Sequence, residues 1–125
     1  MPETRPIVAV IEADATDRRT LCSLLSSLDV DVHDYDSAES YLAARVDALG
    51  CLISDVALPG MSGFELLRVL RNLERWTPVI LVGEEADVRT AVTAMQEGAT
   101  DFIEKPQLDL TILRRVATLI AQTRH

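Results

Sequence analysis

Short apolar runs recur along the chain and are separated by longer segments that mix apolar and polar residues. The runs at residues 7–11, 51–54 and 79–82 are continuous, which is typical of strands buried on both faces of a parallel sheet. Residues 30–35 alternate between apolar and polar side chains and predict a more exposed strand. Residues 101–104 predict a short last strand, so the pattern indicates five strands in all.

The segments between and after these runs carry apolar residues at the spacing of amphipathic helices. The defining residues are Leu21, Leu24, Leu25 and Leu28; Phe64, Leu66, Leu67 and Leu70; Val88, Ala91, Val92 and Met95; and Leu110, Leu113, Ala117 and Ile120. In the last helix, a second set of residues widens the apolar face: Ile112, Val116 and Leu119. A shorter helix is expected over residues 37–44.

Polar residues and a glycine occur at positions that are typical of helix ends. Asp36 with Glu39 and Ser62 with Glu65 have the spacing of capping boxes, and Gly98 suits a left-handed residue after a helix. Strands that alternate with helices predict right-handed crossovers and a parallel sheet covered on both faces. The predicted fold is a doubly wound α/β sandwich of three layers, (βα)5, with the flavodoxin-like strand order 2-1-3-4-5.

Charge and length narrow the possible functions. The chain has 125 residues, of which 48% are apolar, and this is enough for one domain with one hydrophobic core. Its formal net charge is −8, from 20 acidic and 12 basic residues. Duplex binding depends on neutralising phosphates, so this domain is not expected to bind nucleic acid directly. The acidity fits either a solvated surface or a cation site.

The sequence indicates a cytoplasmic domain. Cys22 and Cys51 lie on apolar patterns without metal-binding spacing, which favours free thiols over a disulfide. The first residues lack the apolar core of a signal peptide. No apolar run approaches the ~20 residues that a membrane-spanning helix needs, so no membrane insertion is expected.

Acidic residues follow two of the predicted strands. Glu12 and Asp14 come after the first strand and Asp55 ends the third, while Lys105 follows the fifth. If the first and third strands are neighbours, the three acids meet at the carboxyl edge of the sheet, where open α/β sheets place their ligand sites. Carboxylates this close together need a divalent cation or an ammonium group between them, and oxygen ligands favour Mg²⁺ or Mn²⁺. Beside such a cation, an aspartate is a plausible phosphoryl acceptor.

Two motifs around these residues resemble those of the receiver domain of bacterial two-component response regulators. Residues 55–67 read DVALPGMSGFELL and look like the acceptor loop and the helix that follows it. Residues 94–106 read AMQEGATDFIEKP and look like the closing segment, most similar to receivers that precede LuxR-type DNA-binding domains. The resemblance extends from Ile7 to about Thr123.

This resemblance implies a role for each matching residue. Asp55 would be the phosphorylated aspartate, and the backbone carbonyl of Ala57 would be a ligand for Mg²⁺. Lys105 would pair with the phosphoryl oxygens, with Pro106 as its usual cis-proline neighbour. Phe102 would occupy the aromatic switch position. The implied partner is a sensor histidine kinase, and the implied output surface is the face of the fourth helix, fifth strand and fifth helix, where a homodimer is expected.

The sequence departs from the family pattern at two positions. The family has paired acids after the first strand, and here the pair reads Glu12-Ala13, so Asp14 would replace the missing Mg²⁺ ligand only if the backbone bends. The family has Thr or Ser at the end of the fourth strand, and here the residue is Gly83. A lost charge-assisted hydrogen bond is worth roughly 1.5–3 kcal/mol, comparable to the coupling free energy of a switch. We therefore expect weakened or absent Mg²⁺ binding and altered phosphorylation.

Simpler roles remain open for the same residues. Asp55 could cap the following helix, Lys105 could be solvated, and Phe102 could be an ordinary core residue. Glu12 and Asp14 could be acids that favour the first turn of a helix.

Three functions follow from the sequence. The first is a phosphorylated signalling receiver, and the second is an atypical receiver that works constitutively as an interaction or dimerisation module. The third, a hydrolase with an aspartyl intermediate, is disfavoured because Ala57 stands where a second acid is needed. We expect residues 1–125 to form a single non-enzymatic receiver domain. It is either complete or the N-terminal part of a regulator in which a DNA-binding domain follows.

Overall fold

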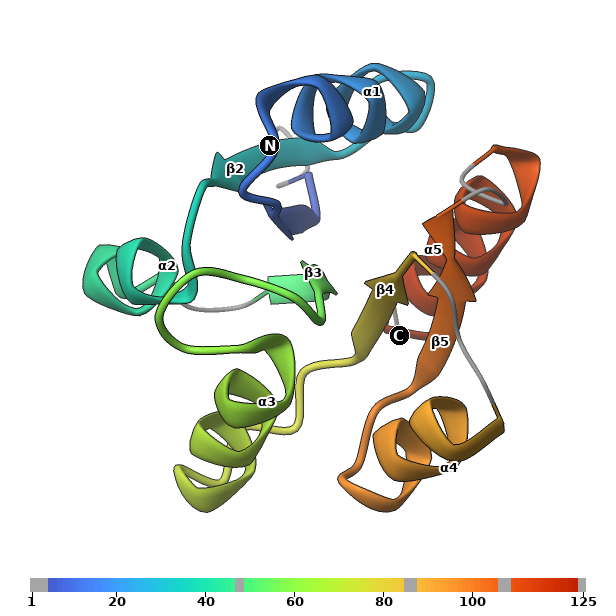
Figure 1. The fold of residues 1–125 in the computed structure, drawn as a ribbon. Coiled ribbons are helices and arrows are strands. Elements are labelled where there is room, and N and C mark those ends of the chain that lie inside the picture. The colour runs from blue at the N-terminus through green and yellow to red at the C-terminus, as the bar shows by residue number, and fades with distance from the viewer. Residues whose placement is uncertain (1–4, 47–48, 85–87, 106–108, 124–125) are drawn as a thin grey trace.

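A five-stranded parallel sheet forms the centre of the computed structural model, which describes residues 5–46, 49–84, 88–105 and 109–123 (Figure 1). The strands are β1 (Ile7–Ile11), β2 (Asp31–Tyr35), β3 (Leu49–Asp55), β4 (Val79–Gly83) and β5 (Asp101–Glu104). Their order in the sheet is β2-β1-β3-β4-β5, and every neighbouring pair is parallel. The predicted fold class and strand order are therefore confirmed.

Five helices cover the sheet on both faces, as the alternating pattern predicted. They are α1 (Ala15–Leu25), α2 (Ala38–Ala44), α3 (Gly63–Asn72), α4 (Val88–Gln96) and α5 (Leu110–Thr123). Buried residues of α1 and α5 pack against one face of the sheet, and those of α2, α3 and α4 pack against the other. Along β1, Val8 and Val10 contact the first layer, while Ala9 and Ile11 contact the second. Successive side chains of a strand point to opposite faces, so both layers need apolar residues from the same run.

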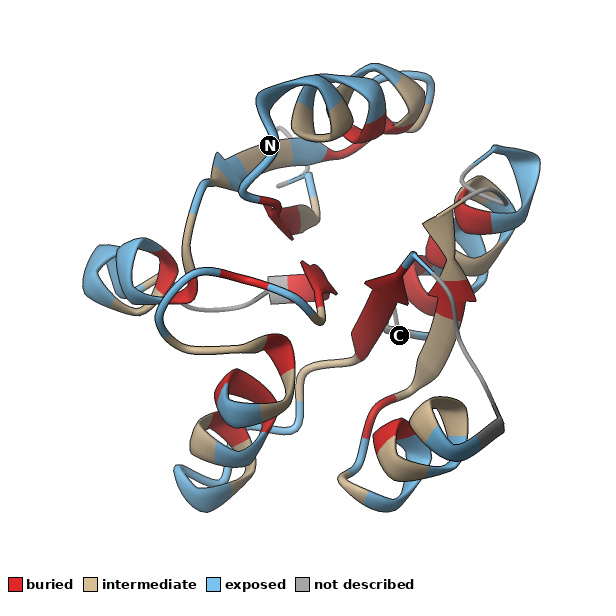
Figure 2. Ribbon diagram, viewed as in Figure 1, coloured by how far each residue is buried: buried red, intermediate tan, exposed pale blue. Residues whose placement is uncertain are grey.

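The position of each strand explains its composition. β4 lies inside the sheet and is buried at every residue, whereas β2 lies at the edge and is buried at none (Figure 2). The prediction that residues 30–35 form the more exposed strand is confirmed. Both cysteines are free thiols, also as predicted. None of the helices in the described ranges combines the length and the apolar character needed to cross a membrane.

Two of the three predicted helix-end features are present. Ser62 and Glu65 form the expected capping box at the start of α3. Gly98 has a φ of 99°, and the N–H of Ala99 bonds to the carbonyl of Ala94, which closes α4 with a Schellman-type turn. The capping box predicted for Asp36 and Glu39 is wrong. Ser37 caps α2 instead, and Glu39 Oε2 accepts the N–H of Met61 at 2.9 Å.

The predicted apolar faces of α4 and α5 also need correction. In α4, Val92 and Met95 are 47% and 52% exposed, whereas Ala94 is buried. In α5, Ile120 is buried as predicted but Leu110 is 63% exposed, and the buried stripe also contains Ile112 and Val116, which were expected only to widen the face. Both helices carry two apolar stripes that satisfy helical spacing, and the spacing alone does not tell which stripe faces the sheet.

Candidate functional site

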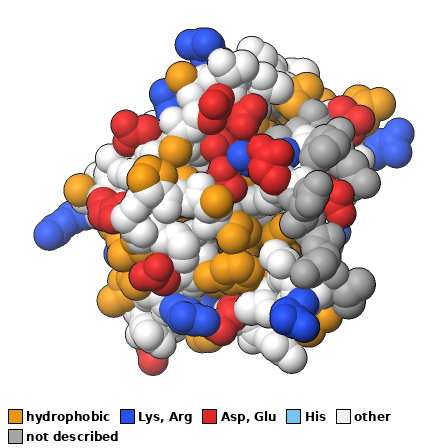
Figure 3. Space-filling model, in the orientation of Figure 1, with side chains coloured by type: hydrophobic (Ala, Val, Ile, Leu, Met, Phe, Trp, Pro, Cys, Tyr) orange, Lys and Arg blue, Asp and Glu red, His pale blue; other side chains and the backbone are white. Residues whose placement is uncertain are grey.

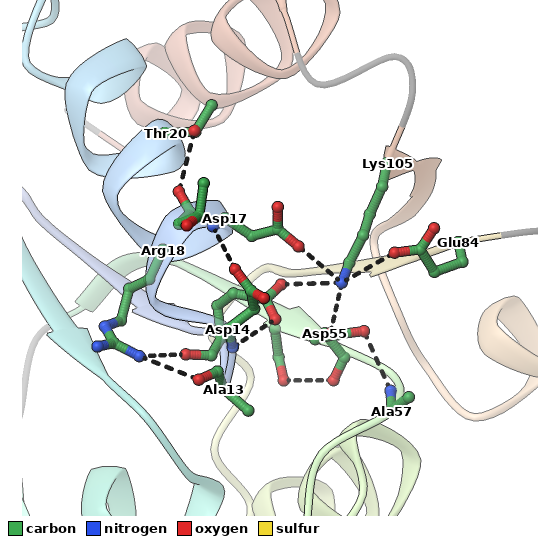
Figure 4. A network of polar contacts seen from close by, with 12 residues as sticks. Ala13, Asp14, Asp17, Arg18, Thr20, Asp55, Ala57, Glu84 and Lys105 are labelled. Carbon is green, nitrogen blue, oxygen red and sulfur yellow. Dashed lines mark hydrogen bonds and ion pairs between the residues drawn. The ribbon is translucent and has the colours of Figure 1, made fainter.

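The strand order brings Glu12 and Asp55 together. Glu12 follows β1 and Asp55 ends β3, and these two strands are neighbours with Ile11 opposite Ser54. Both acids are buried, and Glu12 is only 1% exposed. Lys105 follows β5 and reaches past the end of β4, so that its Nζ lies 2.8 Å from Asp55 Oδ2 (Figure 4). Glu12, Asp55 and Lys105 therefore meet at the carboxyl edge as predicted, whereas Asp14, the third acid of that prediction, makes no ion pair with Lys105.

Lys105 faces four carboxylates, two of which the sequence did not predict for this site. Its Nζ lies 3.3 Å from Glu12 Oε2, 3.4 Å from Asp17 Oδ2 and 3.8 Å from Glu84 Oε1, in addition to Asp55. Burial alone would lower the pKa of the ammonium group, but the contacts with Asp55 and Glu12 outweigh it, and the net pKa is raised. Lys105 is thus a permanent positive charge among acids. Figure 3 shows acidic side chains gathered around basic atoms on this face of the molecule.

Glu12 carries the most perturbed carboxyl group of the site. Its pKa is raised from 4.5 to about 7, first because burial disfavours the charged form, and second because the protonated carboxyl group hydrogen-bonds to Asp55. Repulsion from the Asp55 charge adds to the effect, while Lys105 opposes it. Glu12 Oε2 is buried and has no hydrogen-bond partner among the described residues, although the Lys105 ammonium is within ion-pair distance. Such an atom favours a proton or a further cation.

The backbone around Asp55 is shaped to hold its carboxylate in place. The N–H of Ala57 donates to Asp55 Oδ1 at 3.1 Å, and Lys105 binds the other oxygen. Gly63, the first residue of α3, packs so closely on Asp55 that a Cβ there would clash with the backbone carbonyl oxygen of Asp55. Because this oxygen belongs to the backbone and cannot turn aside like a flexible side chain, the turn requires glycine. The position of Asp55 therefore depends on the turn between β3 and α3.

The loop after β1 is held by its own hydrogen bonds. Asp14 Oδ1 accepts the N–H of Asp17 at 2.9 Å and caps α1, and the N–H of Asp14 points to Glu12 Oε1 at 3.4 Å. Arg18 Nη1 donates to the carbonyl of Glu12 at 2.8 Å, which ties the loop to α1. The structure thus places Asp14 at the N-cap of α1, one residue before the first turn in which the sequence analysis considered it, and its predicted role as an Mg²⁺ ligand stays a prediction.

Gly83 and Phe102 occupy one space. A Cβ built on Gly83 would lie 2.9 Å from Cζ of Phe102, so the phenylalanine ring lies where a larger residue would have its side chain. The two residues line a cleft of about 460 Å³ next to Asp55, together with Val56, Ala57, Glu84 and Thr90. The sequence predicted the missing hydroxyl group at Gly83, but not that the ring of Phe102 takes its place. Pro106 lies outside the described residues.

Asp17 and Glu84 are the site residues that sequence reasoning missed. A signal for Asp17 was available: it precedes Leu21 by four residues and Leu25 by eight, and both leucines are fully buried. Residues four apart lie on one face of a helix, so Asp17 belongs to the inward face of α1 at its sheet-edge end. Glu84 follows Gly83 directly, but nothing in its surroundings in the sequence distinguishes it from other exposed acids.

The oxygen atoms at this edge fit a divalent cation in part. Glu12 and Asp55 provide buried carboxylates of the type that Mg²⁺ prefers, and Glu12 Oε2 makes no hydrogen bond among the described residues, although Lys105 Nζ lies 3.3 Å away. Within the described ranges, no three acidic, histidine or cysteine side chains are arranged to coordinate one ion by themselves. Mg²⁺ commonly keeps several waters and uses only one or two carboxylates, so the residues present suffice to hold it.

The raised pKa of Glu12 predicts a pH dependence of stability in protein freed of divalent cations. Between pH 4.5 and about 7 the native state holds a proton that the unfolded chain has released, so the free energy of unfolding should fall as the pH rises through this window. The total loss should be on the order of 3 kcal/mol. Glu12→Gln should remove this part of the pH dependence, as measured by urea unfolding in EDTA.

Glu74→Gln provides the control, because Glu74 is exposed at the end of α3. It should leave the pH profile of the unfolding free energy as it is in the unaltered protein. A Glu12→Gln profile that parallels the unaltered protein from pH 4.5 to 8 would show that Glu12 does not titrate in this range.

The fold and sequence place the chain in a known family. Residues 8–117 match the response regulator receiver domain. The transcriptional regulatory protein FixJ of Azorhizobium caulinodans is 40% identical over 124 residues, which are 98% of this chain and 58% of that protein. Nodulation protein W of Bradyrhizobium diazoefficiens is 35% identical over 122 residues, which are 97% of this chain and 54% of that protein. The chain thus spans little more than half the length of these curated relatives.

A solved structure agrees. The response regulator receiver protein from Pseudoalteromonas atlantica superposes with a TM-score of 0.89 at 32% identity, and the match covers 95% of this chain and all of the other. The family match covers most of the described residues and includes the whole acidic edge of the sheet. The chain therefore belongs to the response regulator receiver domain family.

Proposed function

We propose that this domain accepts a phosphoryl group on Asp55 from a sensor histidine kinase, and that it works as a signalling domain in the cytoplasm rather than as an enzyme. The observation that carries the proposal is the contact between Lys105 Nζ and Asp55 Oδ2 at 2.8 Å beside buried Glu12. Receiver domains generally bind Mg²⁺ in the acidic pocket at this edge. Here Glu12, Asp55 and the backbone carbonyl of Ala57 are the groups that would hold the ion.

Phosphoryl transfer requires little covalent chemistry from the protein. A carboxylate oxygen of Asp55 forms a bond to phosphorus while the bond between phosphorus and the histidine nitrogen of the kinase breaks, and that nitrogen keeps the electron pair. The ammonium group of Lys105 can follow the negative charge from the carboxylate to the phosphoryl oxygens. Bound Mg²⁺ would neutralise charge on the same oxygens. The N–H of Ala57 holds one oxygen of Asp55, which fixes the orientation of the acceptor.

A second candidate function is a receiver that acts without phosphorylation, and two observations favour it. Ala13 provides no acidic side chain for the cation, and Gly83 provides no hydroxyl group for the phosphoryl oxygens. The ring of Phe102 already occupies the space beside Gly83. A domain with these features would keep its fold and its contact surface, but it would lack the groups that could change conformation on phosphorylation. Labelling of Asp55 separates the two functions.

The surface made by α4, β5 and α5 is the proposed contact surface for a second copy of the domain. Val92 and Met95 of α4 and Leu110 of α5 are large apolar side chains that remain exposed on this surface. An ion pair of 2.9 Å between Arg115 and Asp101 connects α5 to β5. Large exposed apolar side chains on neighbouring elements favour protein contact. Because the relatives are nearly twice as long, we infer that a DNA-binding domain outside this chain carries the output.

Incubation with acetyl phosphate and intact-mass spectrometry test the main proposal. We expect a phosphoryl adduct that requires Mg²⁺ and that disappears in Asp55→Asn. Because Ala13 contributes no ligand, half-maximal labelling should need more Mg²⁺ than an ordinary receiver labelled in parallel. Asp36→Asn, at an exposed acid outside the site, should be labelled normally. No adduct while the ordinary receiver is labelled would favour the phosphorylation-independent function.

The close approach of Gly83 and Phe102 predicts that substitutions at these two positions have coupled effects on stability. Gly83→Ala should push the ring away because the new Cβ would approach Cζ to 2.9 Å. In a double-mutant cycle with Phe102→Ala, measured by urea unfolding, we expect a coupling energy of about 1 kcal/mol. In the Phe102→Ala background, Gly83→Ala should be neutral or stabilising, since alanine suits a strand better than glycine. Additive effects of the two substitutions would contradict the shared space.

A further inference from the structure

Asp17 directs a carboxylate into the phosphorylation site although no motif marks it. It lies in the first turn of α1, four residues after Ala13, and its Oδ2 is 3.4 Å from Lys105 Nζ. Its side chain is 39% exposed, so it stands at the rim of the site, above buried Asp55 (Figure 4). Its own N–H is used by the cap at Asp14, which fixes the turn that carries it.

Asp14 is poorly placed for the same role. Its Oδ1 is engaged by the N–H of Asp17, and its side chain is not among the carboxylates that contact Lys105. Asp17 and Asp14 carry the same charge and are only three residues apart. They therefore form a matched pair in which one acid faces the site and the other faces the helix end.

A second observation points to a cation at this place. Glu12 Oε2 is buried and lacks a hydrogen-bond partner within the described part of the chain, and it faces the space that Lys105 Nζ shares with Asp17 and Asp55. One ammonium group thus neutralises four carboxylates, which leaves a formal excess of negative charge. Burial strengthens this repulsion, so a second positive charge would stabilise the site.

We propose that Asp17 replaces the acidic side chain that Ala13 lacks, and that it helps to bind the divalent cation through a water molecule that the cation retains. The proposal rests on the proposed function of the site. A water-mediated contact agrees with the absence, among the described residues, of three side chains arranged to coordinate one ion directly. It also agrees with the tendency of Mg²⁺ to keep much of its hydration shell.

The expected contribution of Asp17 to cation affinity can be estimated from other metal sites. Partners that act on a metal through its first layer of ligands typically change affinity by 10–100-fold. Asp17 is partly exposed, so its contribution should lie at the lower end, at about tenfold. Since Asp17 carries no buried unpaired group, its replacement by asparagine should leave the fold intact.

Mn²⁺ binding tests this role without any measurement of activity. Mn²⁺ favours the same oxygen ligands as Mg²⁺, and the free ion can be counted by electron paramagnetic resonance. We expect Asp17→Asn to weaken Mn²⁺ binding about tenfold. Asp14→Asn, which keeps a residue able to cap α1, should change it less than twofold. Ala13→Asp in the Asp17→Asn background should restore the affinity, because the acid would return at the position that Asp17 replaces.

Each alternative result has a clear meaning. Equal affinities of Asp17→Asn and the unaltered protein would overturn the role of Asp17, while labelling of Asp55 by acetyl phosphate in the same samples would leave the proposed function standing. If Asp14→Asn and Asp17→Asn lose the same Mn²⁺ affinity, the loss reflects the net charge of the site rather than the position of Asp17. This result would also overturn the role of Asp17. If the unaltered protein binds no Mn²⁺ and Asp55 is not labelled, both proposals fail together.

Discussion

Two carboxyl groups buried side by side set the main physical constraint on this domain. Glu12 and Asp55 come from neighbouring strands, and the parallel pairing of β1 and β3 places both carboxyl groups at the same buried edge of the sheet. Lys105 reduces the repulsion between the two carboxyl groups, because its Nζ lies 2.8 Å from Asp55 Oδ2 and 3.3 Å from Glu12 Oε2. The pKa of Glu12 is nevertheless raised, first because its carboxyl group is buried and then because Asp55 lies beside it, so a proton or a cation would stabilise this position.

The same constraint gives meaning to the two departures from the family pattern. Ala13 adds no acid to an edge that already holds buried Glu12 and Asp55, and Asp17 places a carboxylate at the rim of the site. Gly83 leaves the end of β4 without a side chain, and the ring of Phe102 fills the space. Glu12, Asp55 and Lys105 thus lie together as the sequence predicted, whereas the loop after β1 and the end of β4 differ from the family pattern.

The sequence predicted what depends on strand order and missed what depends on helix rotation. Glu12, Asp55 and Lys105 could be placed because residues that end neighbouring parallel strands must meet at one edge. Asp17 was missed because no motif marks it, and only its spacing from Leu21 and Leu25, which pack α1 against the sheet, indicates its direction. The exposed stripes of α4 and α5 were misassigned for a similar reason, since two apolar stripes competed for the sheet. The capping box of α2 failed because Glu39 bonds to Met61, a contact between residues far apart in the sequence.

The most direct test of this account is the titration of Glu12 followed by carbon-13 NMR of its side-chain carboxyl group. Without divalent cations we expect a midpoint near pH 7, well above the ordinary value of 4.5. Saturating Mg²⁺ should move the midpoint down, because the ion favours the charged carboxylate. A midpoint near 4.5 that ignores Mg²⁺ would contradict the central claim, because Glu12 and Asp55 would then neither crowd each other nor hold a cation.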